Sequence, residues 1–234
     1  MASVKMTVMT TEAVPHPLWR RALAEFLGTG LLVTVVVGSG IAAQRLSVDP
    51  GLQLLENSLA TALGLAVLIL VFQTVSGSHF NPVVTLVDAA LTPGAWRAVP
   101  AYVVAQIAGG IAGAVLANLM FDVPTTLATT ERVDAGRLLA EVVATAGLLL
   151  TIFALARTGR TAIVAPAVGA YIGAAYWFAS STSFANPAVT LGRIFSDTFA
   201  GIAPGSALAY IGAQLVGAAV GLGLIVALLP RRAD

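Results

Sequence analysis

Long apolar blocks alternate with short polar connections along this chain. Six such blocks occur in the 234 residues, and each is close to the roughly 20 residues that a helix needs to cross a bilayer. The pattern therefore predicts an all-α membrane protein with six transmembrane helices. The blocks cover residues 22–43, 58–75, 98–120, 138–156, 161–180 and 205–229.

Two further apolar segments are too short to cross a bilayer. "NPVVTLVDAALTPG" follows the second block and "NPAVTLGRIF" follows the fifth, and segments of 10 to 14 residues are more often re-entrant than spanning. Asparagine is a favoured helix cap, and proline is favoured at the first helical position. Asn81 with Pro82, and Asn186 with Pro187, are therefore predicted to start two half-helices.

Three sequence motifs occur twice in the same order, so the chain is predicted to be a duplicated unit of three spans. An odd number of spans makes the second copy enter the membrane from the opposite side, which gives an inverted repeat. The paired motifs are "AEFLGTGLLV" at 24–33 with "AEVVATAGLLL" at 140–150, "NPVVTL" at 81–86 with "NPAVTL" at 186–191, and "AYVVAQIAGGIAGA" at 101–114 with "AYIGAQLVGAAVGL" at 209–222.

The repeats and the short segments together predict how the chain is divided. Two cytoplasmic tails flank two repeats of three spans, and a polar connection on the outer side joins the repeats. The predicted parts are a tail at 1–20, a first repeat at 21–120 with its half-helix at 82–91, a connection at 121–137, a second repeat at 138–229 with its half-helix at 187–197, and a tail at 230–234.

Composition agrees with a bilayer as the surrounding solvent and partner. Hydrophobic residues make up 58% of the chain and charged residues 10%, whereas soluble domains carry roughly 25% charged residues. The net charge is only +1, and no basic cluster is interleaved with aromatic residues, so nucleic acid is not an expected partner. The absence of cysteine excludes disulfides and thiol chemistry.

Lysine and arginine are distributed unequally between the two sides of the predicted bundle. Eight of the twelve share the side that holds both chain ends, and cytoplasmic segments of membrane proteins carry such an excess. Both termini are therefore predicted to lie in the cytoplasm. The eight residues are Lys5, Arg20, Arg21, Arg97, Arg157, Arg160, Arg231 and Arg232.

Half-helices that enter from opposite sides would meet at the bilayer midplane with their N-termini facing each other. Each N-terminus carries roughly +0.5 elementary charge and unsatisfied N–H groups, and the amides of Asn81 and Asn186 add donors. The extended runs before them must be buried or line water. Such a path favours neutral hydrogen-bonding molecules and repels cations. The carbonyls predicted to line it belong to Gly77, Ser78, His79, Thr182, Ser183 and Phe184.

These residues resemble those of the major intrinsic proteins, the aquaporins and aquaglyceroporins. The resemblance rests on two Asn-Pro-Ala-like boxes, the loop "SGSHFNP" and one glutamate in the first span of each repeat, and it covers about residues 20–229. It implies a passive channel with one pore per subunit, usually a homotetramer. A bacterial member would be a multi-pass protein of the inner (plasma) membrane.

Neither an enzyme nor a bound cofactor is expected. No nucleophile, base and orienting group converge in the sequence, so catalysis is not indicated. A metal site at His79 is disfavoured because the chain has two histidines and only one nearby carboxylate, Asp88. We expect the side chain of His79 to brace its loop by a hydrogen bond.

Glu25 and Glu141 occupy matching places in their spans, where a charge is costly and usually functional. One interpretation is a proton relay, and with it a proton-coupled secondary transporter, a class that also uses inverted repeats and broken helices. The alternative, which the family pattern favours, is that each carboxylate accepts hydrogen bonds from the backbone of a re-entrant loop.

Two positions depart from the family pattern. Val83 replaces the alanine of the first box, which is a mild change. After the alanine of the second box the family normally has an arginine that narrows the outer side of the pore, and here Val189 takes that place. Arg193 lies four residues on, one helical turn further out on the same face. It is expected at the outer mouth, either as a solvated charge or as a displaced filter residue.

Counting from the boxes carries over the other filter positions of the family. The resulting set is Thr61, Ala174, Ser183 and Val189, all small, which implies a wide and uncharged constriction. The resemblance then favours trivalent metalloid hydroxides (arsenite and antimonite) together with small polyols such as glycerol, since arginine-free filters are similar to those of bacterial channels linked to arsenical resistance. A water-selective pore is the alternative.

Overall fold

The computed structural model describes residues 16–229, so the predicted tail at 230–234 and most of the tail at 1–20 lie outside the described residues. Within this part of the chain the secondary structure is helical and contains no strand. Six helices are long and apolar enough to span a membrane, which confirms the predicted all-α membrane fold. Their α-helices are α1 (Leu18–Leu46), α2 (Pro50–Ser76), α4 (Val99–Met120), α5 (Ala135–Arg157), α6 (Val164–Phe178) and α8 (Pro204–Leu228), and the third and fifth spans also include the 3-10 turns that precede α4 and α6.

Two short helices lie inside the bundle. They are α3 (Pro82–Leu91) and α7 (Pro187–Gly192), and 3-10 turns occur at η1 (Ala95–Ala98), η2 (Thr161–Ile163) and η3 (Arg193–Phe195). The second short helix therefore ends before residue 197, the expected boundary. After η3 the backbone becomes extended at Ser196, whose hydroxyl donates a hydrogen bond to Asn118 Oδ1 on α4 at 2.7 Å.

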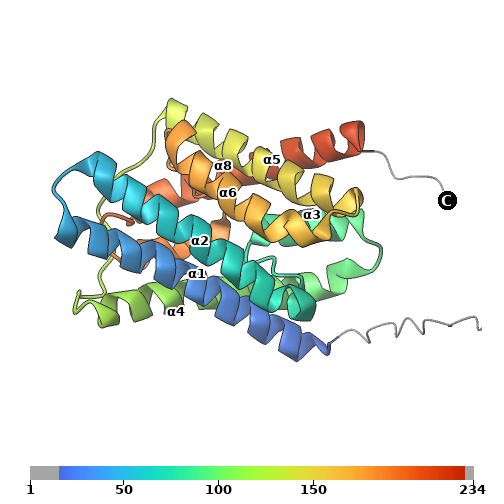
Figure 1. Cartoon of the computed structure of the whole chain (residues 1–234), viewed down its shortest axis with the longest axis horizontal. Helices are drawn as coiled ribbons and strands as arrows, with labels where there is room; N and C mark the ends of the chain where they lie inside the picture. The colour runs from blue at the N-terminus through green and yellow to red at the C-terminus, as the bar shows by residue number, and fades with distance from the viewer. Residues whose placement is uncertain (1–15, 230–234) are drawn as a thin grey trace, which may run out of the picture.

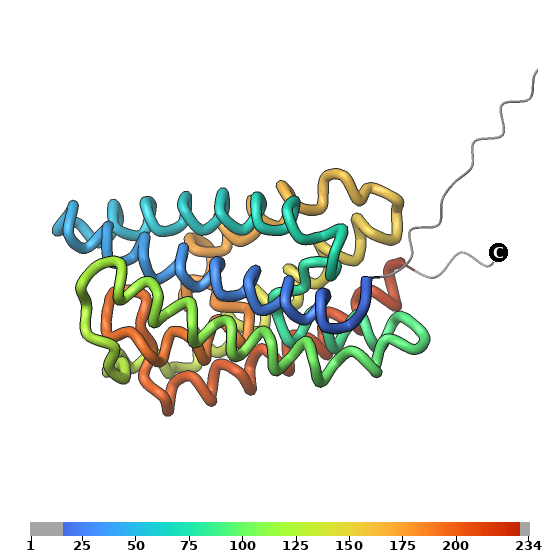
Figure 2. The backbone as a smooth tube through the Cα atoms, turned by 90° about the horizontal axis from the view of Figure 1, so that it is seen from below, coloured from blue at the N-terminus to red at the C-terminus, as the bar shows by residue number. Residues whose placement is uncertain are grey.

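The long helices run along one direction of an elongated bundle (Figure 1). Figure 2 shows that α1 begins and α8 ends at the same end of the molecule. We call this the inner end and the opposite one the outer end. The connection from α1 to α2 lies at the outer end, whereas that from α5 to α6 lies at the inner end, as an inverted repeat requires.

Glycines allow equivalent helices of the two repeats to pack with their backbones close together. A Cβ built on Gly113 of α4 would lie 2.0 Å from the Gly30 carbonyl oxygen of α1, and one on Gly217 of α8 would lie 2.7 Å from the Val142 carbonyl oxygen of α5. Small residues at helix contacts are typical of membrane bundles, where dispersion contacts replace the hydrophobic effect as the attractive force. The first and third spans of each repeat therefore pack against each other in the same way.

We expect Gly113→Ala to destabilise the folded protein, because the added methyl group meets backbone rather than a flexible side chain. Overpacking of this kind costs about 1–3 kcal/mol or more. Gly223→Ala is the matched control, since a Cβ there meets nothing within 4 Å and alanine favours a helix over glycine by about 1 kcal/mol. Size-exclusion chromatography of detergent-solubilised protein after heating compares the two; equal melting temperatures would contradict the close α1–α4 crossing.

Candidate functional site

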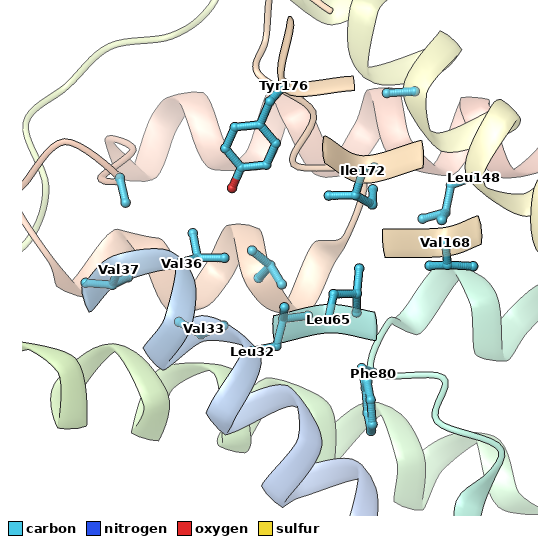
Figure 3. Close-up of a cluster of buried hydrophobic side chains, with 14 of the residues drawn as sticks. Leu32, Val33, Val36, Val37, Leu65, Phe80, Leu148, Val168, Ile172 and Tyr176 are labelled. Atoms are coloured by element: carbon cyan, nitrogen blue, oxygen red, sulfur yellow. The ribbon is translucent and has the colours of Figure 1, made fainter. Parts of the chain in front are cut away.

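A cavity of about 390 Å³ extends along the bundle between the two repeats. At its inner end it is lined by residues such as Asp88 and Thr161, at its middle by both asparagines of the boxes, and toward its outer end by Arg193. Apolar side chains from α1, α2, α5 and α6 face one another to form much of its wall (Figure 3). These include Leu32, Val36, Leu65, Leu148, Val168 and Ile172.

The two half-helices meet through reciprocal hydrogen bonds of their asparagines. Asn81 Nδ2 donates to the Ala185 carbonyl at 2.8 Å, and Asn186 Nδ2 donates to the Phe80 carbonyl at 2.7 Å. Each Oδ1 atom caps its own half-helix, which begins at Pro82 or Pro187, by accepting from a backbone N–H two residues on. Because an amide nitrogen carries two protons, each asparagine keeps a second N–H at the centre of the cavity.

The loops before the half-helices share an unusual backbone. Ser78 and Phe80 have φ angles of 52° and 50°, and the residues 105 positions later, Ser183 and Ala185, have 52° and 47°. A positive φ in a residue other than glycine costs of order 1–3 kcal/mol and persists only where the surroundings impose it. The two loops therefore have the same strained conformation.

The residues of these loops line the cavities. Of the six residues whose carbonyls were predicted to line the path, five border the main cavity, and Thr182 borders a second cavity of about 210 Å³ at the outer end. Ser183 Oγ is buried and has no hydrogen-bond partner among the described residues.

The carboxylate of Glu25 accepts hydrogen bonds from the loop before the first half-helix. Its Oε1 accepts from the Ser76 hydroxyl at 2.6 Å and from His79 N at 3.0 Å, and its Oε2 accepts from Phe80 N at 2.6 Å. The carboxylate is fully buried, and it satisfies backbone donors that would otherwise be unpaired inside the bundle. This is the geometry that the loop-bracing interpretation requires.

Glu141 has the same relation to the second loop. It accepts from Phe184 N and from Ala185 N, both at 2.9 Å. Its side chain is also fully buried. The two carboxylates thus hold equivalent loops in the same way.

Gln106 and Gln214 complete this network, and the sequence interpretation overlooked them. Gln106 Nε2 donates to Glu25 at 2.8 Å and to Thr85 Oγ1 at 2.9 Å, and Gln214 Nε2 donates to Glu141 at 2.7 Å and to Thr190 Oγ1 at 2.9 Å. The sequence contains a feature that could have identified these glutamines, because they occupy matching places in the repeated motifs at 101–114 and 209–222.

His79 contacts its own half-helix. Its Nδ1 lies 3.1 Å from Thr85 Oγ1, and its Nε2 lies 4.0 Å from Asp88 Oδ2. The described residues contain no group of three histidine, cysteine, aspartate or glutamate side chains that could hold a metal ion.

The predicted filter set is wrong at one position. Thr61, Ser183 and Val189 line the main cavity. Ala174 is exposed on the surface of the molecule, and Tyr176 lines the cavity instead. The Tyr176 hydroxyl points toward the middle of the bundle (Figure 3) and lies 3.1 Å from Thr61 Oγ1. Counting from Asn186 assumed a fixed length for the loop, and an error of two residues rotates a helical side chain by about 200°.

Arg193 is not a solvated charge. Its side chain is 3% exposed, its guanidinium carbon lies 3.4 Å from the centre of the Phe184 ring, and its Nε donates to the Ala200 carbonyl. It borders both the main cavity and the outer one. The expectation of a constriction lined only by small, uncharged residues is therefore wrong, because the segment after Ser196 folds back over Arg193 and holds its side chain beside the cavities instead of in bulk solvent.

Arg132, from the connection between the repeats, is the second cation at the outer cavity. It donates to the carbonyls of Gly201 and Phe199 at 2.8 and 2.9 Å, and its guanidinium carbon lies 5.5 Å from the centre of the Phe184 ring. Burial lowers the pKa of Arg132, since removal from water disfavours the charged form.

We expect Glu25→Gln to assemble and to keep part of its solute flux, because the amide oxygen still accepts hydrogen bonds from one side of the loop. Glu25→Ala should assemble poorly, since each unsatisfied buried donor costs about 1–3 kcal/mol. Yield of the folded protein and solute flux into proteoliposomes measure the two effects. Complete loss of transport in correctly assembled Glu25→Gln protein would instead favour a proton relay.

Comparisons with known proteins agree with this geometry. The sequence profile described as "Major intrinsic protein" matches residues 12–182. The chain is 50% identical over 209 residues to "Aquaglyceroporin AqpS" of Rhizobium meliloti (strain 1021), which covers 89% of both chains. It is 31% identical over 228 residues to "Aquaporin NIP6-1" of Arabidopsis thaliana, which covers 91% of this chain and 71% of the relative.

A solved structure shows the same fold. The aquaglyceroporin from Plasmodium falciparum superimposes with a TM-score of 0.73 over 89% of this chain and 96% of its own, at 21% sequence identity. The profile and the bacterial relative each cover most of this chain. On these grounds the protein belongs to the major intrinsic protein family.

Proposed function

We propose that this protein conducts small neutral solutes covered with hydroxyl groups, namely polyols such as glycerol and trivalent metalloid hydroxides, together with water. Its family and its aquaglyceroporin relative establish a channel for small solutes rather than an enzyme. The observation that carries the proposal is the single cavity that joins the inner-end residues, both central asparagines and the outer constriction. The solutes named here go beyond what the family by itself shows.

The chemistry of the cavity wall supports this choice of solutes. Leu65 and Ile172 give part of the wall an apolar surface, and Thr61, Tyr176 and Ser183 add side chains that carry hydroxyls. Thr61 lies one helical turn from Leu65, and Tyr176 one turn from Ile172, so apolar and polar parts follow one another along the path. A polyol has a carbon backbone for the apolar part and hydroxyls for the polar part. The sequence expectation named metalloid hydroxides and polyols together, on the basis of a small, arginine-free filter. Tyr176 adds an aromatic ring with a hydroxyl to the wall, which suits a polyol as well as a metalloid hydroxide, so both solute classes are proposed on equal terms.

We further propose how the protein is placed in the membrane and assembled. The protein is a multi-pass membrane protein. We place it in a bacterial plasma membrane with the inner end in the cytoplasm, because lysine and arginine are more numerous there. Large apolar side chains such as Leu63, Val104 and Leu208 are exposed along the helices, and lipid or neighbouring subunits of a homotetramer would cover them.

Stopped-flow measurements on proteoliposomes test the function directly. Gradients of water, glycerol and arsenite are imposed in turn, with protein-free liposomes as the control. A channel gives flux that is linear in the gradient and insensitive to uncouplers. Flux of water alone would establish a water-selective pore, and saturable uptake driven by a pH gradient would establish the transporter alternative.

We expect Val189→Arg to lower glycerol and arsenite flux by about tenfold while water flux changes much less, because a guanidinium narrows the constriction against the larger solutes. Val189→Leu is the control for bulk without charge and should have a smaller effect. The same stopped-flow assay measures all three solutes. Equal losses of water and glycerol flux in Val189→Arg would show that this position does not discriminate by size.

A further inference from the structure

Equivalent positions after the two asparagine boxes carry opposite charges. Asp88 and Arg193 each lie seven residues after the asparagine of their box. Each also contacts the equivalent residue of its loop: His79 Nε2 lies 4.0 Å from Asp88, and the Phe184 ring centre lies 3.4 Å from the guanidinium carbon of Arg193. Both charged residues border the main cavity, so the path is acidic at its inner end and basic at its outer end.

The cations at the outer end have no carboxylate in direct contact. No ion pair of Arg193 or Arg132 occurs among residues 16–229. Their guanidinium groups donate hydrogen bonds to backbone carbonyls, which are dipoles and do not cancel a full charge. Both guanidinium groups lie against the ring of Phe184. Two cations without an ion-pair partner in the described part of the chain therefore act on the same short part of the path.

Arg193 borders both cavities. It is the residue, among those described, that lines both of them, whereas Arg132 lines only the outer one. A solute that moves from one cavity to the other therefore comes close to this side chain. In a partly desolvated site the repulsion between like charges is several times stronger than in water, so a cation meets a barrier there and an uncharged solute does not.

The half-helix N-termini repel cations at the centre of the path, but two positions away from the centre add nothing to that barrier. Val189, where the family normally has an arginine, is uncharged, and Asp88 attracts cations at the inner end. We propose that Arg193, supported by Phe184 and Arg132, supplies the barrier to cations at the outer end of this channel, one helical turn outward of the usual position. This inference rests on the proposed function, since it concerns the selectivity of the same pore.

Neutralising Arg193 while keeping its hydrogen bond tests the inference. Arg193→Gln retains an N–H donor for the Ala200 carbonyl, and Arg193→Lys is the matched control that keeps the charge. Proteoliposomes are given a potassium gradient and an imposed potential, and the leak of potassium and of protons is measured beside glycerol flux. We expect Arg193→Gln to raise the cation leak by about 10- to 100-fold, and Arg193→Lys to stay within about twofold of wild type.

Two further variants locate the charge. Asp88→Asn changes the equivalent inner position and should not raise the cation leak, because it removes an attraction. The double variant Val189→Arg with Arg193→Gln returns a cation one turn inward and should lower the leak toward the wild-type level. If Arg193→Gln does not assemble, Arg132→Gln replaces it, with an expected increase of severalfold since its charge also acts on the outer cavity.

The outcomes separate this inference from the proposed function. An assembled Arg193→Gln protein that conducts glycerol but leaks no more cations than wild type would overturn the inference and leave the channel function intact. A high cation leak in the wild-type protein would also overturn it. Wild-type protein that conducts neither glycerol, arsenite nor water above the level of empty liposomes would overturn the proposed function instead.

Discussion

Unpaired backbone groups cannot remain inside a membrane, and the rest of this structure depends on how that requirement is met in the two re-entrant loops. The buried carboxylates of Glu25 and Glu141 accept the backbone N–H groups just before the half-helices. With these donors satisfied, the opposite sides of the loops are free to face the cavity. The strained φ angles at Phe80 and Ala185 persist because the same carboxylates hold these residues in place.

The two re-entrant loops of the inverted repeat share a backbone conformation but carry different side chains. In the first repeat a large residue fits against a small one: a Cβ on Gly28 would lie 1.9 Å from a ring atom of Phe80. In the second repeat the equivalent positions are Ala144 and Ala185, both fully buried. Each pair fills its space, so the same fold accommodates two sequences. This freedom allows the two ends of the path to carry different chemistry.

Close packing keeps the path open and its walls in register. The α1–α4 and α5–α8 contacts bring backbones together at glycine, and tightly packed interiors deform little. The helices that border the cavity between the repeats are therefore kept in place by these contacts with neighbouring helices. The residues that line the cavity, among them the apolar Leu65 and Ile172 and the polar Thr61 and Ser183, keep fixed positions relative to the asparagines.

The sequence by itself determined the six spans, the starts of both half-helices, the inverted repeat and the pairing of Glu25 with Glu141. These features depend on hydrophobic length, on local capping chemistry and on internal similarity, all of which can be seen in a single chain. The tertiary structure alone decided that Tyr176 rather than Ala174 lines the cavity and that Arg193 is buried against Phe184. The direction of a side chain changes by about 100° with each residue along a helix, so the choice between Ala174 and Tyr176 depends on the length of the loop that follows α6. The burial of Arg193 depends on a segment later in the chain that folds over it.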